Sequence, residues 1–136
     1  MVFTDGEIAY LASQPLARLA TAQRDGTLQN SPVSAYYNAE RQAIDIGGHN
    51  MATSQKFHNV GRHPQVALVV DDIVSRQPWQ VRCLEIRGEA QAIAEPIDSA
   101  ARMPGAIIRV YPLRIISWGI DPPELALGKR TVPTPR

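Results

Sequence analysis

Residues 46–60 combine the residue types that can bind an anion at the start of a helix. A strand is predicted to end at Gly47 and Gly48, where the missing side chains let a flat ligand approach the backbone. Ser54 and Lys56 follow at the predicted start of a helix, which offers unpaired N–H groups and a partial positive charge. This combination can bind one phosphate group. The same residues also describe an ordinary capped helix with a solvated lysine, so spacing alone leaves both interpretations open.

Other residues with chemical potential give weaker signals. His49, His58 and His63 lie close in sequence, but they fall on a strand end, a helix and the segment beyond it, so no metal site is predicted. Cys83 lies in a stretch of alternating apolar residues and is expected to fill the core rather than to act as a nucleophile. Trp79 and Trp118 are expected in the core or in an interface, with Trp79 on its predicted loop as a candidate to cover a ligand instead.

The composition predicts a single domain over residues 1–136, with a proline-rich tail over 121–136. The formal net charge of +1 provides no large basic field, so neither nucleic acid nor an anionic membrane is an expected partner. One cysteine cannot close an intramolecular disulfide, which favours a reducing, cytoplasmic location. No signal peptide and no apolar stretch of about 20 residues, the length of a membrane helix, is expected.

The elements that must position the anion-binding segment are short strands joined by tight turns. A capping box at Thr4 and Glu7 predicts a helix to about Ser13, and Thr53 is predicted to cap a second helix to about Val60. A further helical turn is predicted over 98–103, and Gly88 is expected at a bulge. Strands are predicted over residues 16–23, 28–37, 43–46, 65–70, 80–94 and 106–120, the last as one strand or as a pair around Pro112. These elements describe a mainly β fold, a six-stranded antiparallel barrel with two or three short helices.

Several motifs resemble the pyridoxamine 5′-phosphate oxidase-like superfamily. Its opening hairpin is similar to PLARLAT at 15–21, DG at 25–26 and SPV at 31–33. Its phosphate-binding helix and next strand are similar to SQKxxNVxxxPxVAL at 54–68. DDIVS at 71–75 and RGEA at 87–90 look like the deazaflavin-dependent branch. The resemblance covers about residues 3–120 and rests on the order and spacing of these motifs together.

The resemblance implies a split barrel that forms a homodimer and holds its cofactor in grooves between subunits. Carried over by position, the motifs imply four groups of cofactor-binding residues. One group binds the phosphate, one lies along the ring or ribityl chain, one flanks the ring, and one consists of two further residues of the helix. These groups are Ser54, Gln55 and Lys56 for the phosphate; Gly47, Gly48, His49 and Asn50 for the ring or ribityl chain; Ser31, Pro32 and Val33 for the flank; and Asn59 and Arg62 on the helix.

The expected cofactor is the deazaflavin coenzyme F420 rather than flavin mononucleotide (FMN). Neutral Gln55 stands where FMN oxidases of the superfamily typically carry arginine, which leaves Lys56 as the cation of the segment. One lysine with helix N–H groups matches the single charge of the F420 phosphodiester better than the near-double charge of the FMN monoester. Arg62 and the arginines between 76 and 87 are candidates for the oligoglutamate tail, whereas Arg62 turned toward the phosphate would complete a monoester site.

The leading hypothesis is therefore an F420-dependent oxidoreductase that transfers hydride to a small organic acceptor. No side chain is assigned as acid or base, because the cofactor supplies the chemistry while the protein binds and orients it. The alternatives are an FMN-binding oxidase or reductase and a non-catalytic protein that carries the cofactor. A haem-binding barrel is a further, weaker alternative.

Overall fold

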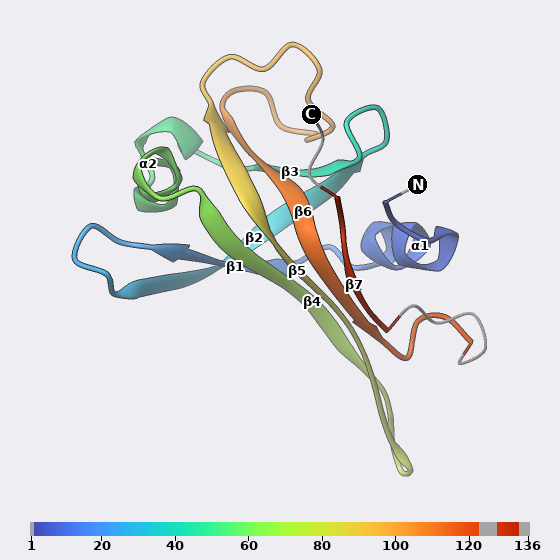
Figure 1. Ribbon diagram of the computed structural model, residues 1–136. Coiled ribbons are helices and arrows are strands. Elements are labelled where there is room, and N and C mark those ends of the chain that lie inside the picture. The colour runs from blue at the N-terminus through green and yellow to red at the C-terminus, as the bar shows by residue number, and fades with distance from the viewer. Residues whose placement is uncertain (1, 123–127, 134–136) are drawn as a thin grey trace.

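The computed structural model describes residues 2–122 and 128–133, and its strands form a closed antiparallel barrel (Figure 1). Hydrogen-bonded neighbours run in the order β3-β2-β1-β4-β5-β6, and pairing of β3 with β6 closes the ring. The predicted mainly β barrel is confirmed. The elements are α1 (Asp5–Ser13), β1 (Ala17–Ala22), β2 (Leu28–Asn38), β3 (Ala43–Gly47), the 3₁₀ helix η1 (Met51–Thr53), α2 (Gln55–Arg62), β4 (Gln65–Arg76), β5 (Trp79–Ile93), β6 (Ile107–Trp118) and β7 (Lys129–Thr131).

Two helices lie on opposite sides of the barrel (Figure 1). The predicted capping box is present, since the Thr4 hydroxyl accepts from the Glu7 amide and the Glu7 carboxylate accepts from the Thr4 amide. The second helix begins one residue later than predicted. Ser54 caps α2, and Thr53 instead ends η1, because the chain turns through the 3₁₀ helix first.

The hairpin of β4 and β5 extends well beyond the barrel (Figure 1). The prediction that β4 ends at Val70 is wrong, because Asp71 and Asp72 remain in register with β5 and the strand continues to Arg76. The pairing of β4 with β1 stops at Val69, and the pairing of β5 with β6 stops at Cys83, which lies opposite Asp71. The hairpin beyond Asp71 is therefore a two-stranded ribbon. Isolated two-stranded ribbons are only marginally stable in water.

The second half of the barrel differs in part from the predicted elements. The predicted bulge at Gly88 is present as a register shift between Arg87 and Gly88, and β6 runs through Pro112 as one strand. The predicted helical turn over 98–103 is wrong, because this segment is a loop without helical structure. The barrel interior is apolar, and its fully buried side chains include Leu19, Ile44, Ile46, Leu68, Leu84, Ile86 and Ile115.

Part of the predicted tail belongs to the fold. Strand β7 pairs with β6 over Arg114–Ile116, which adds a seventh strand that the sequence did not predict. Arg130 on β7 forms an ion pair with the fully buried Glu7 of α1. The tail residues 123–127 and 134–136 lie outside the described residues.

Candidate functional site

Two of the predicted groups meet where β2 and β3 pair. Ser34 lies opposite Gly47, and directly opposite residues of antiparallel strands point to the same face. Pro32, two residues before Ser34, therefore shares the outer face of the barrel with Gly47. Ser31 and Val33 point to the inner face instead, where Ser31 lies opposite the buried Leu19. The structure thus separates Pro32 from its two neighbours.

Ser31 carries an unusual hydroxyl group. Among the residues that the structure describes, its Oγ is the buried side-chain polar atom with no hydrogen-bond partner. Buried polar groups are nearly always paired, so this hydroxyl is an exception among the described residues.

The two glycines after β3 have different surroundings. A Cβ atom on Gly47 would lie 2.9 Å from the Cβ of Ala101, so glycine here permits close packing of the loop that follows β5. A Cβ atom on Gly48 would meet only the Cε atom of Met51, at 3.7 Å. Gly48 therefore leaves its backbone approachable. His49 and Asn50 follow as exposed residues, with Asn50 in the left-handed backbone region at φ 54°.

The start of α2 is partly committed to its own cap. The Ser54 hydroxyl accepts from the Phe57 amide at 3.3 Å and donates to the Met51 carbonyl at 2.7 Å. The remaining amides at this helix start are available to an anion. Lys56 is half-buried and forms no ion pair within the described part of the chain.

Asn59 is turned into the protein and not toward the surface. Its amide nitrogen donates to the Thr21 hydroxyl at 3.0 Å and to Gln29 Oε1 at 3.2 Å. Its Oδ1 accepts from Gln55 at 2.8 Å and from Arg62 at 3.2 Å. This fully buried side chain joins α2 to the first hairpin and orients two of the other predicted residues.

Gln55 and Arg62 line a shared hollow of about 270 Å³ against the turn of the first hairpin. Arg24 and Asp25 from that turn complete it. Arg62 thus lies beside Gln55, and Arg24 is a second arginine at this hollow that the sequence did not indicate. Its position depends on the hairpin folding back against α2, which is a tertiary contact.

The arginines considered for an anionic tail between 76 and 87 are mostly engaged. Arg82 holds Asp72 with two hydrogen bonds, at 2.8 and 3.1 Å, and Arg87 pairs with Glu85. Hydrogen bonding to Arg82 lowers the pKa of Asp72. These guanidinium groups are thus neutralised locally.

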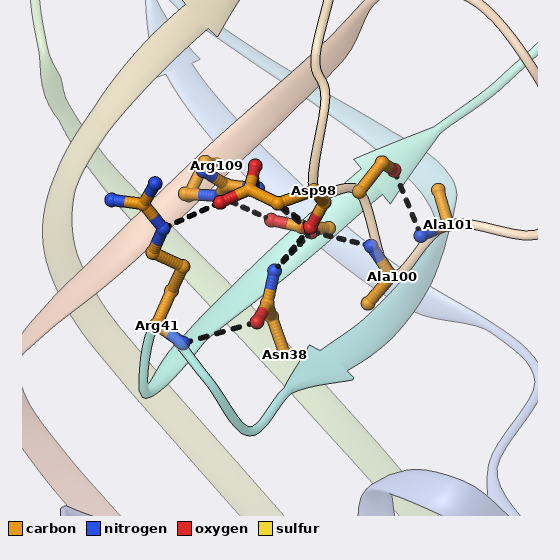
Figure 2. Close-up of polar contacts among 8 residues, drawn as sticks. Asn38, Arg41, Asp98, Ala100, Ala101 and Arg109 are labelled. Atoms are coloured by element: carbon orange, nitrogen blue, oxygen red, sulfur yellow. Dashed lines mark hydrogen bonds and ion pairs between the residues drawn. The ribbon is translucent and has the colours of Figure 1, made fainter.

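A buried ion-pair network on the outer face of β3 was missed by the sequence analysis (Figure 2). Fully buried Asp45 accepts from Arg109 Nε at 2.7 Å, and Arg109 is only 3% exposed. Asp98, in the loop after β5, accepts from Arg109 at 2.9 Å and from Arg41 at 2.6 Å. The Ala100 amide donates to Asp45 at 2.8 Å. The available signal was a charged residue inside each of two apolar strands, AIDIG and IIRVY.

Hydrogen bonding favours the charged forms of Asp98 and Arg109. Hydrogen bonds from Arg109 and Arg41 hold the pKa of Asp98 below its usual value. The hydrogen bond to Asp45 raises the pKa of Arg109. Charged partners on both sides therefore fix the loop with charge-assisted hydrogen bonds, which are shorter and stronger than neutral ones.

The remaining candidates do not form a reactive cluster. Within residues 2–122 and 128–133, no three His, Cys, Asp or Glu side chains could hold a metal ion together. Cys83 is half-buried, and desolvation raises the pKa of its thiol, which disfavours the nucleophilic thiolate. No helix of the described chain is long and apolar enough to cross a membrane.

Comparison with known proteins gives consistent results. Residues 4–112 match the family model for pyridoxamine 5′-phosphate oxidase. A 5a,11a-dehydrotetracycline/5a,11a-dehydrooxytetracycline reductase from Streptomyces rimosus is 44% identical over 124 residues, which are 89% of this chain and 86% of the relative.

Two solved structures share the fold. One is the FAD binding protein from Mycobacterium smegmatis, with TM-score 0.62, 20% identity, and coverage of 85% of this chain and 93% of that one. The other is an F420 reductase, with TM-score 0.55, 22% identity, and coverage of 75% and 90%. The family match extends over most of the chain and includes both the first hairpin and the segment from Gly47 to Arg62. The chain therefore belongs to the pyridoxamine 5′-phosphate oxidase family.

Proposed function

We propose that this chain is a reductase that uses coenzyme F420 to reduce a conjugated carbon–carbon double bond in a fused-ring acceptor. The observation that carries the proposal is the 44% identity to a dehydrotetracycline reductase over 89% of the chain. The name of that relative describes reduction at the bond between ring positions 5a and 11a. The fold shared with an F420 reductase supports the choice of cofactor.

The residues at the end of β3 and the start of α2 fit such a cofactor. The open backbone at Gly48 would admit a flat ring, and Pro32, on the outer face that it shares with Gly47, would flank the ring. Lys56 and the free amides of α2 would bind the phosphate. Bound F420 supplies the hydride, and the protein orients the ring and excludes water.

FMN remains the second candidate because of one observation. Arg62 and Arg24 lie around Gln55 in the same hollow, so two guanidinium groups stand near the proposed phosphate position. A monoester phosphate benefits from such paired, bidentate cations. For F420, the same two groups would bind the first carboxylates of the oligoglutamate tail.

Titration of the apo-protein with F420 and with FMN, followed by ring fluorescence, tests the cofactor. Tighter binding of F420 is expected, and tighter binding of FMN would replace the proposal with the FMN enzyme. Addition of 5a,11a-dehydrotetracycline to protein with reduced F420 then tests the reaction. Oxidation of the cofactor is expected, whereas binding without oxidation would identify a carrier.

Lys56→Ala is expected to weaken F420 binding by about ten- to a hundredfold, the equivalent of a lost charge-assisted contact of about 1.5–3 kcal/mol. His58→Ala, an exposed change on the same helix, is the matched control and should leave affinity unchanged. Both variants should retain wild-type thermal stability. Equal affinity in Lys56→Ala and wild type would remove Lys56 from the site.

We also propose a homodimer that covers the β4–β5 ribbon. Trp79 and Trp118 are 63% and 67% exposed and line an open hollow of about 620 Å³ with Val74. Neighbouring exposed apolar side chains, such as these two tryptophans and Val74, are typical of interaction surfaces. Twofold dimers are the commonest oligomers. Light scattering at micromolar concentration should give twice the chain mass. A monomeric mass would contradict the dimer.

A further inference from the structure

The buried ion pair of Asp45 and Arg109 holds the loop after β5 in position. The pairing of β3 with β6 does not need this ion pair, because apolar side chains already pack the two strands together on the inner face. Burial of an ion pair also costs desolvation energy that apolar packing avoids. Both carboxylates of the network, however, connect the loop to the barrel. Asp45 accepts from the Ala100 amide, and Asp98 itself belongs to the loop (Figure 2). The network therefore fixes where residues 98–101 lie.

The fixed loop lies directly beside the proposed cofactor position. Ala101 packs closely on Gly47, because a Cβ atom added to Gly47 would lie 2.9 Å from the Cβ atom of Ala101. Met103 approaches the same glycine, at 4.0 Å from that position. Gly48 follows without such cover, and Pro32 lies on the same outer face as Gly47. The loop thus covers Gly47 and leaves the backbone of the next residue, Gly48, open.

After Ala101 the loop presents one cation and one flexible apolar side chain. Met103 is 41% exposed. Arg102 is exposed, and its guanidinium carbon lies 5.9 Å from the centre of the Tyr36 ring. Arg102 forms no ion pair within residues 2–122 and 128–133. Its charge therefore has no acidic partner among these residues, and the Tyr36 ring lies within the range of a cation–π interaction.

We propose that residues 98–103 form a wall of the acceptor site, in which Arg102 recognises a negatively charged group on the acceptor and Asp98 is a positioning residue that acts through Arg102. The acceptor class is then a conjugated ring system that carries an acidic group, such as an ionised enol or a carboxylate. This inference rests on the proposed reductase function and adds the specificity determinant. Arginine suits the role because its planar fork binds two oxygens at once.

Steady-state kinetics with reduced F420 and 5a,11a-dehydrotetracycline test the wall. Arg102→Gln is expected to raise the acceptor KM about tenfold, the lower end for a charge-assisted contact at a partly exposed site. The kcat and the F420 affinity should stay within about twofold of wild type. Arg102→Lys keeps the charge and should recover most of the KM. Lys129→Gln, which removes an exposed cation from β7, is the control and should match wild type.

Asp98→Asn tests the positioning. Hydrogen exchange of the amides in residues 98–103 should accelerate, and the acceptor KM should rise in the same direction as in Arg102→Gln. The double variant Asp98→Asn/Arg102→Gln should be no worse than Arg102→Gln alone, because both changes remove one interaction. Additive losses would overturn the positioning role of Asp98.

The outcomes separate this inference from the function on which it rests. A wild-type protein that binds F420 and reduces the acceptor, with an unchanged KM in Arg102→Gln, would overturn the wall and leave the reductase intact. Equal increases of KM in Arg102→Gln and Arg102→Lys would overturn recognition of charge. A wild-type protein that neither binds the cofactor nor reduces the acceptor would refute the reductase, and the wall with it.

Discussion

Replacement of Asn59 by alanine is expected to destabilise the fold without any ligand present. The change removes four hydrogen bonds at a fully buried position, two donated to the first hairpin and two accepted from within α2. The Thr21 hydroxyl, which is 2% exposed, would lose its partner, at a cost of about 1–3 kcal/mol for an unsatisfied buried group. Gln29, Gln55 and Arg62 reach water, so their losses are small. The cavity left behind brings the expected total to about 2–4 kcal/mol.

Equilibrium urea unfolding of the apo-protein measures this loss as a shift of the midpoint at constant slope. His58→Ala, exposed on the same helix, should change the free energy of unfolding by less than about 0.5 kcal/mol. A stability of Asn59→Ala within that same margin of wild type would refute the reasoning. Asn59 would then be free to act on a ligand, as the sequence motif implied.

Three further outcomes are expected. Gly88→Ala should lower the free energy of unfolding by about 1–3 kcal/mol in urea titrations, because its Cβ would lie 2.2 Å from the Tyr111 carbonyl oxygen; wild-type stability would contradict this packing. Asp98→Asn should be less stable than wild type at neutral pH. Since pairing with Arg109 lowers the folded-state pKa of Asp98, the stabilisation is present above the ordinary aspartate pKa of about 3.9 and is lost as pH falls through the lower folded value. The urea midpoints of the two proteins should therefore converge in acid, and a constant gap would exclude this origin. Trp118→Ser should shift the oligomer toward monomer in sedimentation at micromolar concentration, whereas an unchanged dimer would exclude the exposed tryptophan from the interface.

Local signals in the sequence were sufficient for most of the elements. The capping box of Thr4 and Glu7, the Asp25-Gly26 turn and the bulge at Gly88 depend on residues close in the chain, and the structure contains all three. The barrel class followed from the number of strands and the tight turns between them. The motif order likewise indicated the family, because spacing along a chain is a property of the sequence itself.

The limits of α2 and β4 were harder to predict because neighbouring structure decides them. Asp71 and Asp72 end a strand in most contexts, yet here β5 pairs with them and Arg82 neutralises Asp72. Strand β7 has no periodic pattern over its short length, and it exists because β6 offers an open edge. Long-range pairing overrides local preference in both cases.

For the candidate site, the sequence determined which residue types are present, and the tertiary structure decided their roles. Gly47 and Gly48 look alike in the chain, but only the packing of Ala101 against Gly47 distinguishes a structural glycine from an open one. Asn59 faces the interior because the first hairpin folds beneath α2 and supplies Thr21 as a partner. Asp45 and Arg109 lie far apart in sequence. They become an ion pair only when the barrel closes, because the pairing of β3 with β6 that closes it places the two residues directly opposite each other.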